Sequence, residues 1–169
     1  IDPYTCAGCG ICSAVCPTGA AKYAVPAENS LINRIHTVLS SYLLARGQSP
    51  IILFHDTSWG VEMISMLARN FDGLPSHILP LAVNSPSQLG LDNIFSAAAF
   101  GASEIIYLFS KDKSDEKNAL EEQRQIANLV LEELGYGKER VRFFDDPDPE
   151  KLTKVMWELE ERPGLPAGE

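Results

Sequence analysis

Hydrophobic and polar positions follow two alternating periods along residues 50–161. Short apolar runs rich in branched residues predict buried strands, and apolar residues three or four positions apart predict amphipathic helices. The predicted strands cover residues 51–55, 77–83, 104–109 and 140–144. The predicted helices cover residues 30–46, 59–71, 88–100, 115–134 and 149–161. On the helix over 115–134 the apolar side chains are expected to face inward, namely Leu120, Ile126, Ala127, Val130 and Leu134.

This alternation predicts an α/β fold, because no hairpin signal joins any two of the strands. Right-handed crossovers then give a small flavodoxin-like parallel sheet of four strands in the order 2-1-3-4, with helices on both faces. A cysteine loop and the helix over 30–46 precede the sheet, and that helix is expected to pack against it. The predicted divisions are a cysteine motif (1–27), a connecting helix (28–49), an α/β domain (50–162) and a linker or tail (163–169).

Composition and charge narrow the class of protein. The 169 residues are 45% hydrophobic and contain no apolar run near the ~20 residues of a membrane helix, so we expect no membrane insertion and a cytoplasmic protein. The net charge of −9, concentrated after residue 111, opposes binding to nucleic acid. These acids could steer a basic protein partner, although keeping a helical surface solvated is the commoner role.

The four cysteines carry the strongest chemical signal. Cys6, Cys9, Cys12 and Cys16, followed by Pro17, form the pattern C-x2-C-x2-C-x3-C-P, which is the spacing of 4Fe–4S cluster ligands. A disulfide framework fits poorly because the four residues lie too close together to staple a fold. Zinc fits poorly because its usual cysteine pairs stand a dozen or more residues apart. The motif therefore predicts a 4Fe–4S cluster, with these four cysteines as the only metal ligands of the chain.

Residues 2–22 resemble the second half of a bacterial two-cluster ferredoxin. The resemblance implies that Cys6, Cys9 and Cys12 hold one cluster and that Cys16 ligates the cluster of the other half. The sequence contains no other half-motif. We therefore expect a segment of a longer multi-cluster protein, whose other domains supply the remaining ligands, and an absent or incomplete cluster in this segment alone.

Residues 50–146 resemble the delta subunit of methyl-viologen-reducing hydrogenases. The resemblance is carried by the runs at 51–56, 79–82 and 100–106. It implies a protein that passes electrons between a hydrogenase and a heterodisulfide reductase. That family has cysteines at the strand ends, but here the matching segments 55–60, 83–86 and 109–112 contain none. The resemblance thus implies the fold without the cluster of that domain.

Polar residues follow the first three predicted strands, at the edge where α/β sheets bind ligands. They are His55, Asp56, Thr57 and Ser58, then Asn84 and Ser85, then Ser110 and Lys111. Thr57 and Ser58 could hold a flavin phosphate at a helix N-terminus. The simpler interpretation is that Asp56, Thr57 and Ser58 cap the following helix, since no glycine-rich phosphate loop is present. No catalytic nucleophile is recognisable.

Two functions follow from these features. The first is electron transfer through ferredoxin-type 4Fe–4S clusters, with the α/β domain docking redox partner proteins. The alternative is an electron-feeding module of a flavin- or substrate-binding oxidoreductase, and a plain interaction scaffold is a third interpretation of the α/β domain. The chain is expected to be an electron carrier or oxidoreductase component rather than a stand-alone enzyme.

Overall fold

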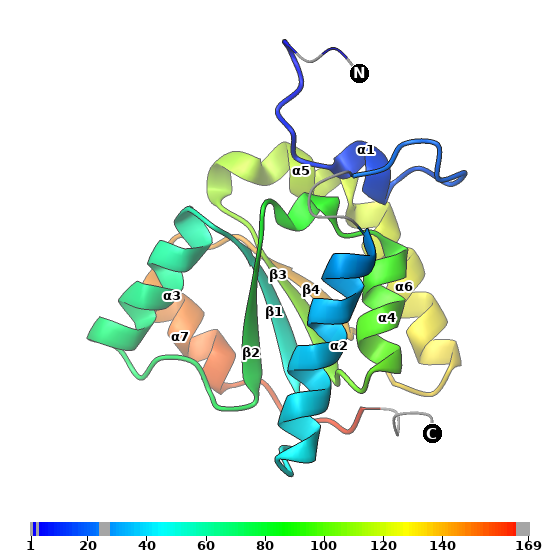
Figure 1. Ribbon diagram of the computed structural model, residues 1–169. Helices are drawn as coiled ribbons and strands as arrows, with labels where there is room; N and C mark the ends of the chain where they lie inside the picture. Colours follow the sequence, from blue (N-terminus) through cyan, green and yellow to red (C-terminus); the bar gives the residue numbers. More distant parts are fainter. Residues whose placement is uncertain (1, 3, 24–27, 165–169) are drawn as a thin grey trace.

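The parallel sheet has the predicted strands in the predicted order. The computed structural model describes residues 2, 4–23 and 28–164. Its strands are β1 (Ile51–Asp56), β2 (Ile78–Val83), β3 (Glu104–Leu108) and β4 (Val141–Phe144). They pair in parallel in the order β2-β1-β3-β4 (Figure 1). Pro80 is tolerated in β2 because this strand lies at the edge of the sheet, where a missing N–H donor costs little.

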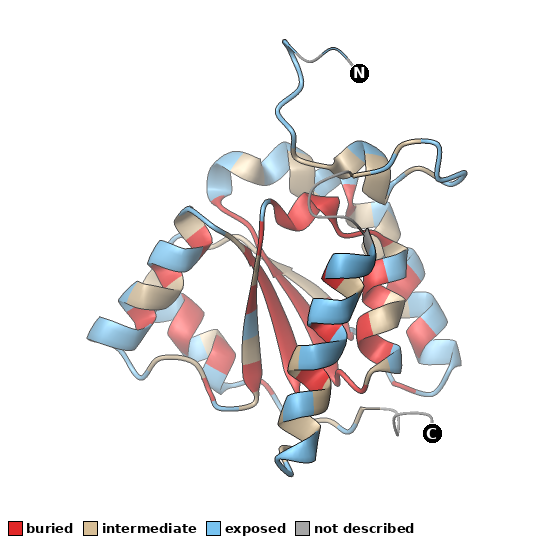
Figure 2. Cartoon of the chain, viewed as in Figure 1, coloured by how far each residue is buried: buried red, intermediate tan, exposed pale blue. Residues whose placement is uncertain are grey.

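Helices cover both faces of the sheet, as predicted. One face carries α2 (Glu28–Leu44), α4 (Leu91–Ala99) and α6 (Glu121–Glu133), and the other carries α3 (Trp59–Asn70) and α7 (Pro149–Trp157) (Figures 1 and 2). The two-residue period of β1 builds both cores. Ile52 and Phe54 belong to the core under α2, α4 and α6, whereas Ile51 and Leu53 belong to the core under α3 and α7.

The prediction of a helix over 88–100 is wrong about where the helix begins. A 3₁₀ turn, η1 (Pro86–Gln88), comes first, and α4 begins only at Leu91. Gly90 separates the two in an extended conformation, and a Cβ atom there would lie 2.6 Å from the carbonyl oxygen of Ala14. The close approach of the cysteine segment therefore decides where α4 begins, which no local periodicity could indicate.

The helix predicted over 115–134 is two helices. It breaks at Leu120 into α5 (Ser114–Ala119) and α6, and a 3₁₀ turn, η2 (Lys111–Lys113), precedes α5. The predicted inward face is confirmed for Leu120 and Ala127 and wrong for the other three residues, because Ile126, Val130 and Leu134 are exposed. The inward stripe instead runs through Leu120, Ala127 and Leu131, which are seven and four residues apart, and Ile126 and Val130 flank it on the solvent side.

Three smaller features complete the description. The last helix ends at Trp157 rather than at residue 161, and the indole N–H of Trp157 donates to the carbonyl of Gly73 at 3.1 Å. A single helical turn, α1 (Ile11–Ala14), forms inside the cysteine motif. No helix in the described ranges is long and apolar enough to cross a membrane.

Candidate iron–sulfur site

The cysteine loop bends through glycines and directs backbone N–H groups at sulfur. Gly8 and Gly10 have φ angles of 68° and 84°, a left-handed conformation that costs glycine little, and α1 starts directly after Gly10. The N–H of Gly8 donates to Cys6 Sγ at 3.4 Å, and the N–H of Ala21 donates to Cys16 Sγ at 3.5 Å. Such N–H···S bonds stabilise thiolate ligands and tune iron–sulfur clusters.

Cys16 is the cysteine whose thiol is most clearly activated. The hydrogen bond from the Ala21 N–H, with further help from Thr18, lowers the pKa of Cys16 to about 6. The Thr18 hydroxyl lies 3.5 Å from its sulfur. Because the thiolate is the form that binds metal, a lowered pKa prepares this side chain for ligation near neutral pH.

Hydrogen bonds fasten the cysteine loop to the carboxyl end of the sheet. The Ser87 hydroxyl of η1 lies 3.2 Å from the carbonyl oxygen of Cys9, and the Asn84 amide donates to the carbonyl of Gly8 at 3.3 Å. Tyr23 Oη donates to the same Gly8 carbonyl at 2.7 Å and accepts from Asn84 at 2.6 Å. These contacts join residues far apart in sequence, so the tertiary fold positions the loop.

Close packing reinforces these hydrogen bonds. A Cβ atom on Gly10 would lie 2.5 Å from Gln88 Cβ and 2.9 Å from the ring of Tyr23. Ile11 and Ala14 of α1 also pack against the larger core. The loop thus rests directly on η1, with no room for a side chain at Gly10.

A cluster of polar side chains around Glu116 orients the Ser87 hydroxyl that contacts the Cys9 carbonyl. Glu116 of α5 accepts hydrogen bonds from Ser85 at 3.0 Å and from Lys113, and it shares the single hydroxyl proton of Ser87 with the Cys9 carbonyl. Burial raises the pKa of Glu116, but these hydrogen bonds outweigh burial, and the net pKa lies below its ordinary value. An ionised Glu116 is therefore a fixed acceptor that holds both serines in place.

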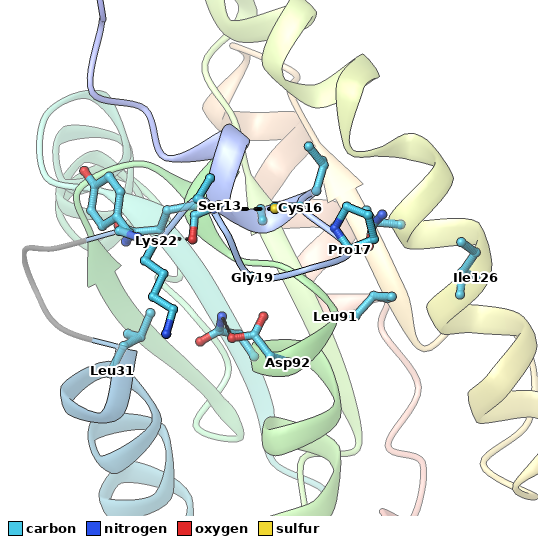
Figure 3. Close-up of a pocket in the computed structure, with 16 residues that line it drawn as sticks. Ser13, Cys16, Pro17, Gly19, Lys22, Leu31, Leu91, Asp92 and Ile126 are labelled. Atoms are coloured by element: carbon cyan, nitrogen blue, oxygen red, sulfur yellow. Dashed lines mark hydrogen bonds between the residues drawn. The ribbon is translucent and has the colours of Figure 1, made fainter. Parts of the chain in front are cut away.

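Cys9 and Cys16 line two different pockets. The Cys9 pocket, about 410 Å³, lies at the ends of β1, β2 and β3 and includes Asp56, Asn84 and Ser110. The Cys16 pocket, about 500 Å³, lies between the loop and the first turns of α4 and α6. In Figure 3, Cys16 and Pro17 lie above Leu91 and Asp92, with Ile126 of α6 at the side. The two pockets share no lining residue, so the two sulfurs have separate surroundings.

The donor chemistry of the loop fits a cluster, although its sulfurs are not gathered around one point. Within residues 2, 4–23 and 28–164, no three side chains of histidine, cysteine, aspartate or glutamate come close enough to hold one metal ion. All four cysteines are free thiols, and each is at least partly exposed. Four thiols at cluster spacing, with N–H donors on Cys6 and Cys16, are the ligand set that iron–sulfur clusters use.

The polar residues predicted at the strand ends do meet. Asp56, Ser58, Asn84, Ser85 and Ser110 all line the Cys9 pocket. Asp56 accepts from the N–H groups of Ser58 at 2.7 Å and Gly60 at 3.1 Å, so the predicted capping of α3 is confirmed for this carboxylate. An anion at this helix start would meet the Asp56 carboxylate already bound there.

His55 is a core residue rather than a ligand. Its side chain is buried, its Nδ1 lies 2.9 Å from the carbonyl oxygen of Asp56, and burial lowers its pKa. Lys111 and Thr57 do not line the Cys9 pocket.

Sequence reasoning missed Tyr23, Ser87, Gln88 and Glu116, the residues that hold the loop. Ser87 alone has a local signal, the short run Asn84–Ser87 directly after β2.

Comparison with known proteins identifies the cysteine segment. Residues 1–22 match the family described as 4Fe-4S binding domain. This segment is therefore of the ferredoxin type and binds a 4Fe–4S cluster, which supports electron transfer as its role. The match does not extend into the α/β domain, and no curated protein matches the chain.

Proposed function

We propose that this chain is an electron-transfer module whose α/β domain holds the cluster segment and docks a redox partner protein. Cys6, Cys9, Cys12 and Cys16 are the proposed iron ligands. A bound 4Fe–4S cluster would supply one-electron chemistry at a potential set by its surroundings. The residues of the chain hold the loop and direct N–H groups at sulfur.

The observation that carries this proposal is the pair of hydrogen bonds to the cysteine loop from Asn84, which directly follows β2, and from Ser87 of η1. Ser87 and Asn84 bond the carbonyls of Cys9 and Gly8 at the carboxyl end of the sheet. In open α/β sheets this edge ordinarily binds a ligand. Here the cysteine loop is fastened at this edge and Cys9 lines the pocket there, which supports a domain that carries the cluster segment.

The resemblance of residues 50–146 to the delta subunit of methyl-viologen-reducing hydrogenases also supports a role in electron transfer. That family passes electrons between two enzymes, and the present domain has the expected fold. The strand-end segments contain no cysteine, so on this proposal every cluster ligand of the chain lies in the ferredoxin-type segment.

The test is iron–sulfur reconstitution of the intact protein under anaerobic conditions. We expect Cys9→Ala to abolish the iron–sulfur absorbance of the cluster bound by this segment. The control Val15→Ala alters an exposed side chain of the same loop and should leave the spectrum intact. An unchanged spectrum for Cys9→Ala would contradict the ligand assignment. Release of stoichiometric flavin on acid denaturation would instead favour the oxidoreductase alternative.

A further inference from the structure

The outer side of α6 presents apolar residues to solvent. Ile126, Leu129 and Val130 are all exposed, and Leu129 keeps 62% of its surface accessible. Residues three and four apart lie on the same side of a helix, so these three side chains form one patch. We call this patch, with the flanking Glu122 and Glu133, the α6 face.

Two unpaired acids bracket the apolar patch. Glu122 stands four residues before Ile126, and Glu133 stands four residues after Leu129. Eleven residues of helix separate their Cα atoms by about 16 Å along the axis. Neither acid is in an ion pair within the described part of the chain, whereas Glu121 pairs with Arg124 and Glu132 pairs with Lys138. The α6 face therefore offers an apolar centre between two free negative charges.

The α6 face also adjoins the fourth cysteine of the motif. Ile126 lines the Cys16 pocket together with Cys16 and Pro17 (Figure 3). A protein that covered the α6 face would also cover the mouth of this pocket. Its surface would then lie next to a proposed cluster ligand, which electron transfer requires.

We propose that the α6 face docks a basic redox protein whose apolar contact patch is flanked by lysine or arginine. The identity of this partner as a redox protein rests on the proposed function. Apolar contact at Leu129 supplies affinity, and Glu122 and Glu133 speed association and set the register. A second copy of this chain is disfavoured as the occupant because its own net charge is −9 and its α6 face would bring acid against acid.

The experiment uses cytochrome c as the probe, since it is a basic electron acceptor with an apolar haem edge among lysines. Binding to the intact, isotope-labelled protein is followed by NMR chemical shifts at low salt. We expect the shifts to map to the α6 face. Leu129→Glu and Glu133→Lys should each weaken binding about tenfold, and Glu133→Lys should also flatten its salt dependence.

The matched controls lie on α3, which covers the opposite face of the sheet. Met66→Glu and Glu62→Lys make the same chemical changes at exposed positions and should leave binding unchanged. An equal loss in these controls would overturn the proposal, because binding would then follow overall charge. Self-association that Leu129→Glu abolishes would also overturn it, because a second copy would be the occupant.

The rate of cytochrome c reduction by the cluster-loaded protein separates this proposal from the proposed function. If NMR maps the probe to α6 but no electrons pass, the docking surface stands and the electron-transfer function fails. If electrons pass from the Leu129→Glu variant to cytochrome c as fast as from the unaltered protein, the function stands and the docking surface fails.

Discussion

The hydroxyl of Ser87 lies 3.2 Å from the carbonyl oxygen of Cys9, and this hydrogen bond joins residues 78 positions apart. Ser87 also contacts the carboxylate of Glu116, and the hydroxyl of Ser85 donates a hydrogen bond to the same carboxylate. The loop that carries the cluster ligands is thus held by a serine whose orientation depends on a third element, α5. This relationship ties the position of the cysteine loop to the α/β domain.

Loss of the Ser87 hydroxyl should loosen the cysteine loop. Ser87 bonds the ionised Glu116 as well as the Cys9 carbonyl, and a hydrogen bond to a charged group contributes about 2 kcal/mol. We therefore expect Ser87→Ala to cost about that much stability and to accelerate loss of iron–sulfur absorbance in the presence of a chelator. The matched control is Ser103→Ala, which removes a buried hydroxyl bonded to Ser49 and Pro50 at the opposite end of the sheet. Equal rates of cluster loss in the two variants would contradict this role of Ser87.

A side chain at Gly10 should displace the loop from η1. Gly10→Ala adds a Cβ atom 2.5 Å from Gln88 Cβ, in addition to the strain of about 1–2 kcal/mol for a left-handed residue. Gly8→Ala introduces only the backbone strain of a left-handed residue, because no atom lies within 4 Å of its added Cβ. We expect lower cluster content after reconstitution for Gly10→Ala than for Gly8→Ala. Equal cluster content would show that contact with η1 is not needed.

The Asp56 cap should contribute to the stability of the α/β domain. Asp56→Ala removes the acceptor for two N–H groups at the start of α3 and should cost about 1 kcal/mol. Asp56→Asn keeps an acceptor oxygen and should retain most of that stability. Urea denaturation measures the free energy of unfolding of both variants. If Asp56→Ala is as stable as the wild type, the Asp56 carboxylate does not stabilise the start of α3.

Glu104 makes the stability of the fold dependent on pH. Its side chain is 1% exposed, and its oxygens lie 3.3 Å from Arg142 and 3.5 Å from Arg162 without hydrogen-bond geometry. Burial raises the pKa of Glu104 above its ordinary value of 4.5, although the arginines oppose the shift. The folded protein therefore binds this proton more tightly than the unfolded chain does.

The free energy of unfolding should accordingly fall as the pH rises from the ordinary value through the raised pKa. Glu104→Gln removes the titrating group and should remove this part of the fall. Urea denaturation at a series of pH values from 4 upward measures the difference. Exposed Glu62, changed to Gln, is the control, and parallel curves for wild type and Glu104→Gln would contradict the assignment.

Local spacing of residues along the chain was enough to predict the strand order, the cysteine motif and the cluster of polar strand ends. The strand order β2-β1-β3-β4 followed from alternating strand and helix periods, because short crossovers leave few arrangements for a parallel sheet. The cysteine motif followed from its spacing alone and agrees with the family match over residues 1–22. The meeting of Asp56, Asn84 and Ser110 also followed, since the carboxyl ends of parallel strands share one edge.

Contacts between distant segments set the remaining features, and these could not be predicted from the spacing of residues. Gly90 lies against the Ala14 carbonyl directly before α4, and Leu120 separates α5 from α6. Ile126 and Val130 face solvent although their spacing alone is that of a core stripe, because Ala127 and Leu131 occupy the side of α6 that packs on the core. Ser87 reaches Cys9 only when β2 and the cysteine loop are folded together. The periodicity of apolar residues indicates which residues lie on the same side of a helix. Tertiary packing determines whether that side faces the core or the solvent.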